Sequence, residues 1–294
     1  MTTGNDGKGP WPLGCQLRPW LQTWGAERLA ARLTDVIEIV AAIGYDGFET
    51  AMTALPLDDP AGFREATVRA GGLRLAAAHA GGPWWQPEGA AIAREIGERA
   101  RGLPALGCDR LLISMTQPVE LLTDYQTGLM IANLRTIAAA CRTEGVSVAF
   151  HNHAAELARD AEFIATIVGR LDPAEMGLGT DLGWVVRGGA DPLEFVSRFG
   201  DRLAYLHVRD LTAGPDGRFT EVGQGSQDIP ALLRDLEGAG YRGWLVAESE
   251  FGDGWQGVTD PEQTIRRQFV GLRAALLKSG VDTAERQGAA ILQG

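Results

Sequence analysis

The sequence predicts an α/β protein, specifically a (β/α)8 TIM barrel. Three observations lead there: an apolar strand and an amphipathic helix alternate repeatedly, glycine recurs at the helix-to-strand junctions, and the strand segments are nearly continuous apolar runs. Continuous apolar runs are typical of strands buried on both faces, as in a parallel sheet. Eight such units of roughly 30 residues account for most of the 294-residue chain, a usual length for one barrel domain.

Strands are expected at 13–17, 46–49, 73–79, 109–114, 146–151, 176–181, 203–207 and 243–248. Six of them follow a glycine, namely Gly44, Gly71, Gly107, Gly145, Gly200 and Gly240. Glycine just past the end of a helix adopts the left-handed conformation without a Cβ penalty. The repeated glycine therefore indicates repeated helix-to-strand transitions.

Amphipathic helices are expected at 26–43, 125–144 and 261–278. An open, doubly wound sheet is the alternative architecture, but it would carry a glycine-rich dinucleotide loop after its first strand, and residues 13–25 contain none. No linker or change in composition divides the chain. We therefore predict one catalytic barrel domain over residues 11–280, with flexible tails at 1–10 and 281–294.

Charge and composition exclude several classes of protein. The chain has 27 Lys and Arg against 38 Asp and Glu, a net charge of −11, and lacks the basic surface that nucleic-acid binding requires. No apolar run is long enough to span a bilayer, and the N-terminus does not resemble a secretory signal. Cys15, Cys108 and Cys141 have no metal-type spacing and are expected to be reduced, buried thiols. These features predict a cytoplasmic protein that binds neither membranes nor nucleic acid.

All four histidines of the chain, His79, His151, His153 and His207, fall at or just after the predicted strand ends. In a TIM barrel the active site lies at the C-terminal ends of the strands. His151, Asp181, His207 and Glu248 lie at the ends of strands five to eight, which are neighbours around the barrel. Imidazole and carboxylate ligands suit Mn²⁺, Zn²⁺, Co²⁺ or Fe²⁺. These four residues are therefore the predicted metal ligands, with His153 as the alternative to His151.

Further polar and aromatic residues are expected around the mouth of the barrel. Glu49 and His79 lie opposite the metal ligands and are predicted to contact substrate, although Glu49 equally suits a structural acid that closes a strand. Trp184 is predicted to stack on a sugar or ring substrate. No cluster of basic residues is dedicated to a phosphate, which favours a neutral substrate, although Arg209, Arg18 or Arg187 would supply one charge; of these, Arg209 is the predicted substrate contact. The segment from Gly223 resembles a phosphate loop but lacks its lysine, and we expect Asp228 to cap the following helix.

With these residues the chain resembles the sugar phosphate isomerase/epimerase superfamily, the xylose isomerase-like TIM barrels. The matching segments are 44–49, 151–153, 179–184, 189–192, 206–210, 222–225 and 228–230, together with the strand that ends at Glu248. The resemblance runs from about Leu13 to Leu277. The order and spacing of these segments are more specific than any one of them.

The resemblance implies one divalent ion, Mn²⁺ first and Zn²⁺, Co²⁺ or Mg²⁺ as alternatives, held by Asp181, His207 and Glu248. In the epimerases of the superfamily a glutamate on strand five is the fourth ligand, and His151 stands in that place here. The His151-Asn152-His153 segment resembles inosose dehydratases and enzymes of 3-keto sugars. Family members often pair through their barrel faces, which leaves a homodimer open.

The expected chemistry is enolisation next to a carbonyl of a carbohydrate or cyclitol, through a metal-stabilised enediolate. His153 or Glu248 is the predicted base, and His79 is a predicted proton donor or hydroxyl contact. Return of the proton gives an isomerase or epimerase, the favoured prediction. Loss of a β-substituent gives a lyase, either like inosose dehydratase or a 3-keto-glycoside β-eliminase. An endonuclease IV-like enzyme is disfavoured by charge, and a non-enzymatic binding module is the third hypothesis.

Overall fold

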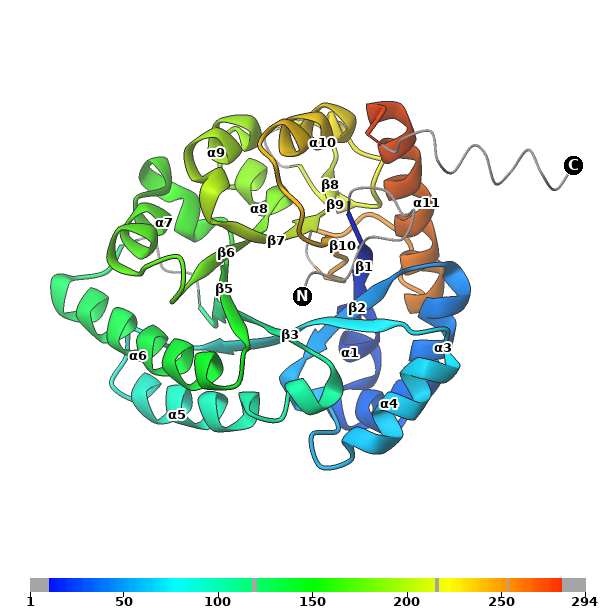
Figure 1. Cartoon of the computed structure of the whole chain (residues 1–294). Coiled ribbons are helices and arrows are strands. Elements are labelled where there is room, and N and C mark those ends of the chain that lie inside the picture. The colour runs from blue at the N-terminus through cyan, green and yellow to red at the C-terminus, as the bar shows by residue number, and fades with distance from the viewer. Residues whose placement is uncertain (1–10, 118–120, 215–216, 253, 282–294) are drawn as a thin grey trace, which may run out of the picture.

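The computed structural model describes residues 11–117, 121–214, 217–252 and 254–281. Eight parallel strands close into a barrel in the order β1-β10-β7-β6-β5-β4-β3-β2, which confirms the predicted (β/α)8 fold (Figure 1). The strands are β1 Leu13–Gln16, β2 Gly47–Ala51, β3 Arg74–Gly82, β4 Arg110–Met115, β5 Ser147–His151, β6 Gly177–Asp181, β7 Leu203–Val208 and β10 Leu245–Ala247. All eight lie within a few residues of the predicted ranges.

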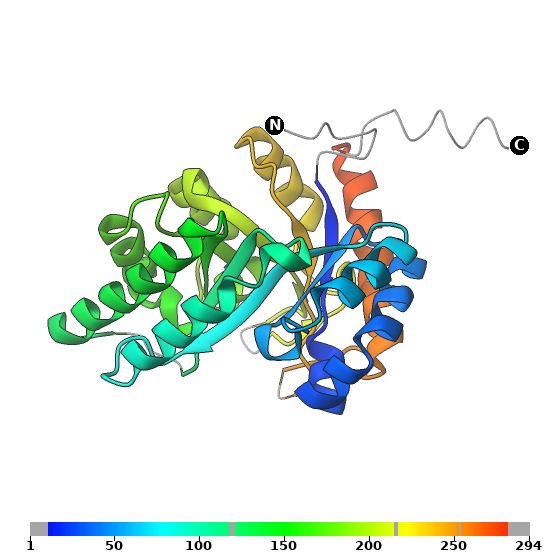
Figure 2. The same ribbon diagram turned by 60° about the horizontal axis from the view of Figure 1, so that its bottom comes forward.

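Helices surround the barrel as an outer layer (Figures 1 and 2). They are α1 Arg18–Trp24, α2 Ala26–Ala31, α3 Leu33–Ile43, α4 Pro60–Arg69, α5 Gly89–Ala100, α6 Asp124–Thr143, α7 Ala158–Arg170, α8 Leu182–Arg187, α9 Pro192–Phe199, α10 Ile229–Gly238 and α11 Pro261–Ser279. A short antiparallel hairpin, β8 Asp210–Leu211 and β9 Phe219–Thr220, follows β7. The apolar side chains between strands and helices form the main core, and a smaller cluster that includes Leu112, Tyr205 and Val246 is also buried.

The helix predicted at 26–43 is not continuous. Residues 26–43 form two helices, α2 and α3, which are separated at Arg32. Arg32 has φ −118° and ψ 16°, outside the helical region, and no proline or glycine marks the break in the sequence. The helices predicted at 125–144 and 261–278 are confirmed as α6 and α11.

The glycines at the predicted helix-to-strand junctions have the expected left-handed conformation, with one exception. Gly44 ends α3 in the left-handed conformation with φ 109°, as predicted. Gly200 is different: its φ is −59°, because the chain continues from α9 into a 3₁₀ turn at Gly200–Arg202. The backbone there stays right-handed, so this junction needs no glycine for conformational reasons.

The predicted tails, 1–10 and 281–294 apart from Val281, lie outside the described residues, so the domain boundaries remain a prediction. Within the described ranges, none of the helices combines the length and the apolar composition needed to cross a membrane.

Candidate metal centre and active site

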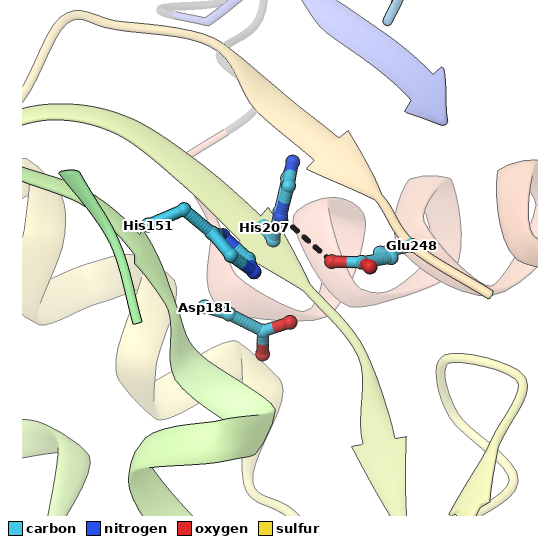
Figure 3. A group of neighbouring side chains, drawn as sticks. All are labelled: His151, Asp181, His207 and Glu248. Carbon is cyan, nitrogen blue, oxygen red and sulfur yellow. Dashed lines mark ion pairs between the residues drawn. The ribbon is translucent and has the colours of Figure 1, made fainter. Parts of the chain in front are cut away.

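Four polar side chains from adjacent strands meet at the C-terminal end of the barrel. His151 and Asp181 end β5 and β6, His207 lies in β7, and Glu248 directly follows β10. One ligand atom from each residue lies within 4.8 Å of the others, and all four residues are buried. Figure 3 shows the side chains pointing toward one another. The structure thus brings together the four residues that the sequence suggested as ligands.

The atoms that face this centre fit a divalent cation. His151 Nδ1, Asp181 Oδ2, His207 Nδ1 and Glu248 Oε2 are buried and make no hydrogen bond among the described residues, although all but His151 Nδ1 take part in an ion pair. Buried polar atoms are nearly always satisfied, and two imidazole nitrogens with two carboxylate oxygens form a common ligand set for Zn²⁺, Mn²⁺ or Fe²⁺. His207 Nδ1 and Glu248 Oε2 lie 2.7 Å apart as an ion pair (Figure 3). These four residues could therefore hold one metal ion.

Glu49 lies beneath this group and contacts two histidines. Its Oε2 lies 2.5 Å from His207 Nε2, and its Oε1 lies 3.2 Å from His79 Nδ1 and accepts a hydrogen bond from Gln16 at 3.0 Å. Burial raises the pKa of this carboxyl, but the facing rings of His207 and His79 outweigh burial and lower the pKa to about 2. Glu49 is fully buried, and its predicted contact with substrate remains a prediction.

Arg209 is also buried and contacts two members of the group. Its Nε lies 2.7 Å from Asp181 Oδ2, and its Nη2 lies 2.6 Å from Glu248 Oε1. The guanidinium lies 4.3 Å from the ring centre of Phe219 and 5.2 Å from that of Trp184. The cation therefore balances two of the predicted ligand carboxylates, and its predicted contact with substrate remains a prediction.

His151 and His153 have different surroundings. Burial lowers the pKa of both rings, that of His153 to about 4, so both imidazoles are neutral at pH 7 and each keeps a free lone pair. His151 belongs to the group of four, whereas the His153 side chain is 34% exposed and lies 5.0 Å from the His151 ring. The backbone N–H of His153 donates to the buried carboxylate of Glu156 at 2.7 Å, which holds the loop after β5. The geometry favours His151 as the ligand.

A cavity of about 310 Å³ opens over the centre. The predicted residues His79, His151, His153 and Glu248 line it, while its described lining does not include Glu49, Trp184 or Arg209. The lining also includes Gln16, Ser114, Arg18 and Glu250. The sequence pointed to Arg18 only as a possible charge for a phosphate and ranked Glu250 below Glu248, and it did not point to Gln16 or Ser114. Gln16 ends β1 and Ser114 lies next to the end of β4, so strand-end position is the signal that could have identified them. Glu250 pairs with Arg18 across the mouth.

The glycine-rich loop is organised by a carboxylate of this chain. Asp210 accepts backbone hydrogen bonds from Gly223, Gly225 and Gln227 at 2.9, 3.0 and 3.1 Å. These N–H groups are the ones that a phosphate would need. Asp228 caps α10 through the N–H of Ala231 at 2.9 Å, as predicted. The loop is therefore a structural element beside the centre.

Comparison with known proteins agrees with this fold and site. Residues 37–274 match the family model of the xylose isomerase-like TIM barrels, and the chain belongs to that family. Inosose dehydratase of Geobacillus kaustophilus is 29% identical over 148 residues, which cover 45% of this chain and 48% of that protein. The chain thus matches about half the length of this curated relative.

Two solved structures share the fold over nearly their whole length. The 3-keto-D-glucoside 4-epimerase YcjR of E. coli has a TM-score of 0.67 and 19% identity, covering 90% of this chain and 99% of that one. D-allulose 3-epimerase of Methylomonas sp., in complex with D-allulose, has a TM-score of 0.70 and 18% identity, covering 91% and 98%. The chain is therefore similar in fold to enzymes named for sugar epimerisation and in part of its sequence to an enzyme named for inosose dehydration.

Proposed function

We propose that this protein is a divalent-metal-dependent isomerase or epimerase of a small keto sugar or related polyhydroxy carbonyl compound. The observation that carries the proposal is the group of His151, Asp181, His207 and Glu248, whose buried ligand atoms lie within 4.8 Å of one another. Two of these residues, His151 and Glu248, line the polar cavity. When bound, a divalent ion supplies Lewis-acid polarisation of a carbonyl and its neighbouring hydroxyl, which acidifies the α-proton. Mn²⁺ is our first choice of ion.

The chain's own residues account for proton movement and substrate orientation. His153 lies on the cavity wall beside His151 and is our choice as the base that takes the α-proton, with Glu248 as the alternative. His79 also lines the cavity; Glu49 holds its Nδ1 and the Ser114 hydroxyl lies 3.0 Å from its Nε2. This fixed ring is suited to contact a substrate hydroxyl or to return a proton through Ser114.

A lyase is the second candidate, and one observation favours it. The strand-five ligand position holds His151, so the centre has only one glutamate, Glu248, among its four ligands. A single carboxylate does not provide the two matched acid/base groups that a symmetric epimerisation uses on opposite faces of a carbon. The identity to inosose dehydratase supports the same alternative. Expulsion of a β-hydroxyl or β-glycosyl oxygen after enolisation would then replace reprotonation.

Proton exchange in D₂O tests both candidates. Purified protein is stripped of metal, reloaded with Mn²⁺, and incubated with keto sugars and inososes while NMR follows the α-protons. Deuterium entering an α-carbon without loss of substituent supports the isomerase, and loss of water or an aglycone supports the lyase. The His207→Ala variant serves as the control that should show neither. Absence of exchange with all substrates and metals would overturn the proposal.

The proposal includes a cytoplasmic location, which the three buried, unpaired cysteines support. The homodimer remains a prediction.

A further inference from the structure

A second cavity adjoins the polar one at the mouth of the barrel. Its volume is about 570 Å³, against about 310 Å³ for the cavity over the metal centre. Three residues, Met115, Thr116 and His153, line both cavities. The two spaces therefore share a wall, and a molecule too large for the first could extend past His153 into the second.

The two cavities differ in chemistry. The polar one is lined by charged groups that include Arg18, Glu248 and Glu250. The second is lined chiefly by half-buried apolar side chains, Ala154, Ala155 and Ala158 after β5 and Trp184 of α8, and no carboxylate is among its described lining residues. A space of this size with an apolar lining is typical of a pocket for a small organic group.

His153 stands at the junction between them. Its ring lies 5.0 Å from the ring of His151, which belongs to the metal centre, and 5.7 Å from the ring of Trp184 in the second cavity. A sugar bound over the centre could therefore direct one substituent past His153 toward Trp184. Aromatic edges and faces pack favourably against a planar ring at such separations.

We propose that the second cavity binds an apolar, aromatic substituent of the substrate, so that the substrate class is a sugar or cyclitol carrying an aryl group. The inference rests on the proposed function, which identifies the polar part of the substrate as a sugar or cyclitol. The polar cavity has the size for a single sugar ring, and the larger, apolar cavity is left for the aryl group. Arg187 is the one cation among the described lining residues of the second cavity, and it is exposed with its guanidinium 5.4 Å from the ring centre of Trp184. It offers little to a phosphate, which usually needs several donors.

Equilibrium binding tests the inference without requiring turnover. Dissociation constants of Mn²⁺-loaded protein are measured by calorimetry for methyl β-D-glucopyranoside, phenyl β-D-glucopyranoside and glucose 1-phosphate. Burial of a phenyl ring should make the phenyl glycoside bind roughly tenfold to a hundredfold more tightly than the methyl glycoside. The Ala158→Phe variant, whose new ring fills the second cavity, should reduce this ratio to about one. Ala139→Phe on the exposed surface of α6 is the matched control and should keep the ratio.

Three results would overturn the inference: equal affinity for the methyl and phenyl glycosides, tighter binding of glucose 1-phosphate than of the phenyl glycoside, or an unchanged ratio in a folded Ala158→Phe variant. Ala155→Phe provides a second filling variant if Ala158→Phe does not fold. The D₂O exchange experiment separates this inference from the proposed function. If α-protons exchange but the phenyl glycoside binds no more tightly than the methyl glycoside, only this inference fails. If the phenyl glycoside binds more tightly but no α-proton exchanges, only the proposed function fails.

Discussion

Glu49 Oε2 and His207 Nε2 lie 2.5 Å apart, although 158 residues separate them in the sequence. This contact occupies one nitrogen of the imidazole and leaves Nδ1 directed at Glu248 and the metal centre. Outer carboxylates commonly fix the tautomer and orientation of a metal-binding histidine in this way. We therefore expect Glu49 to act as a positioning residue for His207.

Replacement of Glu49 by glutamine should weaken metal binding. The amide cannot supply the negative charge that orients His207, so we expect the dissociation constant for Mn²⁺ to rise roughly 10- to 100-fold. Calorimetric titration of the metal-free protein measures this directly. Glu38→Gln, an exposed carboxylate on α3, is the control and should leave affinity unchanged. Equal affinity in Glu49→Gln and wild type would refute the positioning role.

Replacing His151 and replacing His153 should have different effects, one on metal content and the other on proton exchange. His151→Ala removes one of four ligands, and we expect the purified variant to hold little metal by elemental analysis. His153→Ala should keep near-stoichiometric metal but lose α-proton exchange, because His153 lies on the cavity wall outside the group of four. The reverse pattern, with metal lost only from His153→Ala, would exchange their roles.

Arg209 should matter for stability. Its removal leaves Asp181 and Glu248 buried beside each other without their shared cation. Loss of one partner from a buried ion pair typically costs about 3–5 kcal/mol. We expect Arg209→Met to lower the free energy of unfolding of the metal-free protein by this amount in urea titrations. Arg187→Met, which loses an exposed cation over the same two aromatic rings, should change it by less than about 1 kcal/mol. Similar losses in both variants would contradict this account.

The cysteines should be unreactive in the folded protein. All three are buried, and burial raises the pKa of Cys108 to about 11 and that of Cys141 to about 12, with Cys15 raised also. At pH 8 each thiol therefore stays protonated and shielded. Ellman's reagent should detect no thiol within minutes in native protein and three in 6 M guanidinium. Rapid release of one equivalent from native protein would show that a cysteine is accessible.

Sequence reasoning located the centre because its signals are local. An apolar strand followed at once by a polar residue marks a strand end, and His151, Asp181, His207 and Glu248 each fit that pattern. The closed topology of a barrel then brings adjacent strand ends together whatever the details of packing. The break at Arg32 and the right-handed Gly200 could not be predicted in the same way, since packing and a following turn decided them.

The sequence by itself determined the barrel and the residues available at its mouth, because apolar periodicity and strand-end position depend on near neighbours along the chain. Only the tertiary structure decided how those residues are used. In the folded protein Glu49 contacts His207, and Arg209 pairs with both Asp181 and Glu248. A second, apolar cavity forms next to His153. Such contacts join side chains that are far apart in sequence, and their directions follow from strand register and from the packing of loops around the mouth.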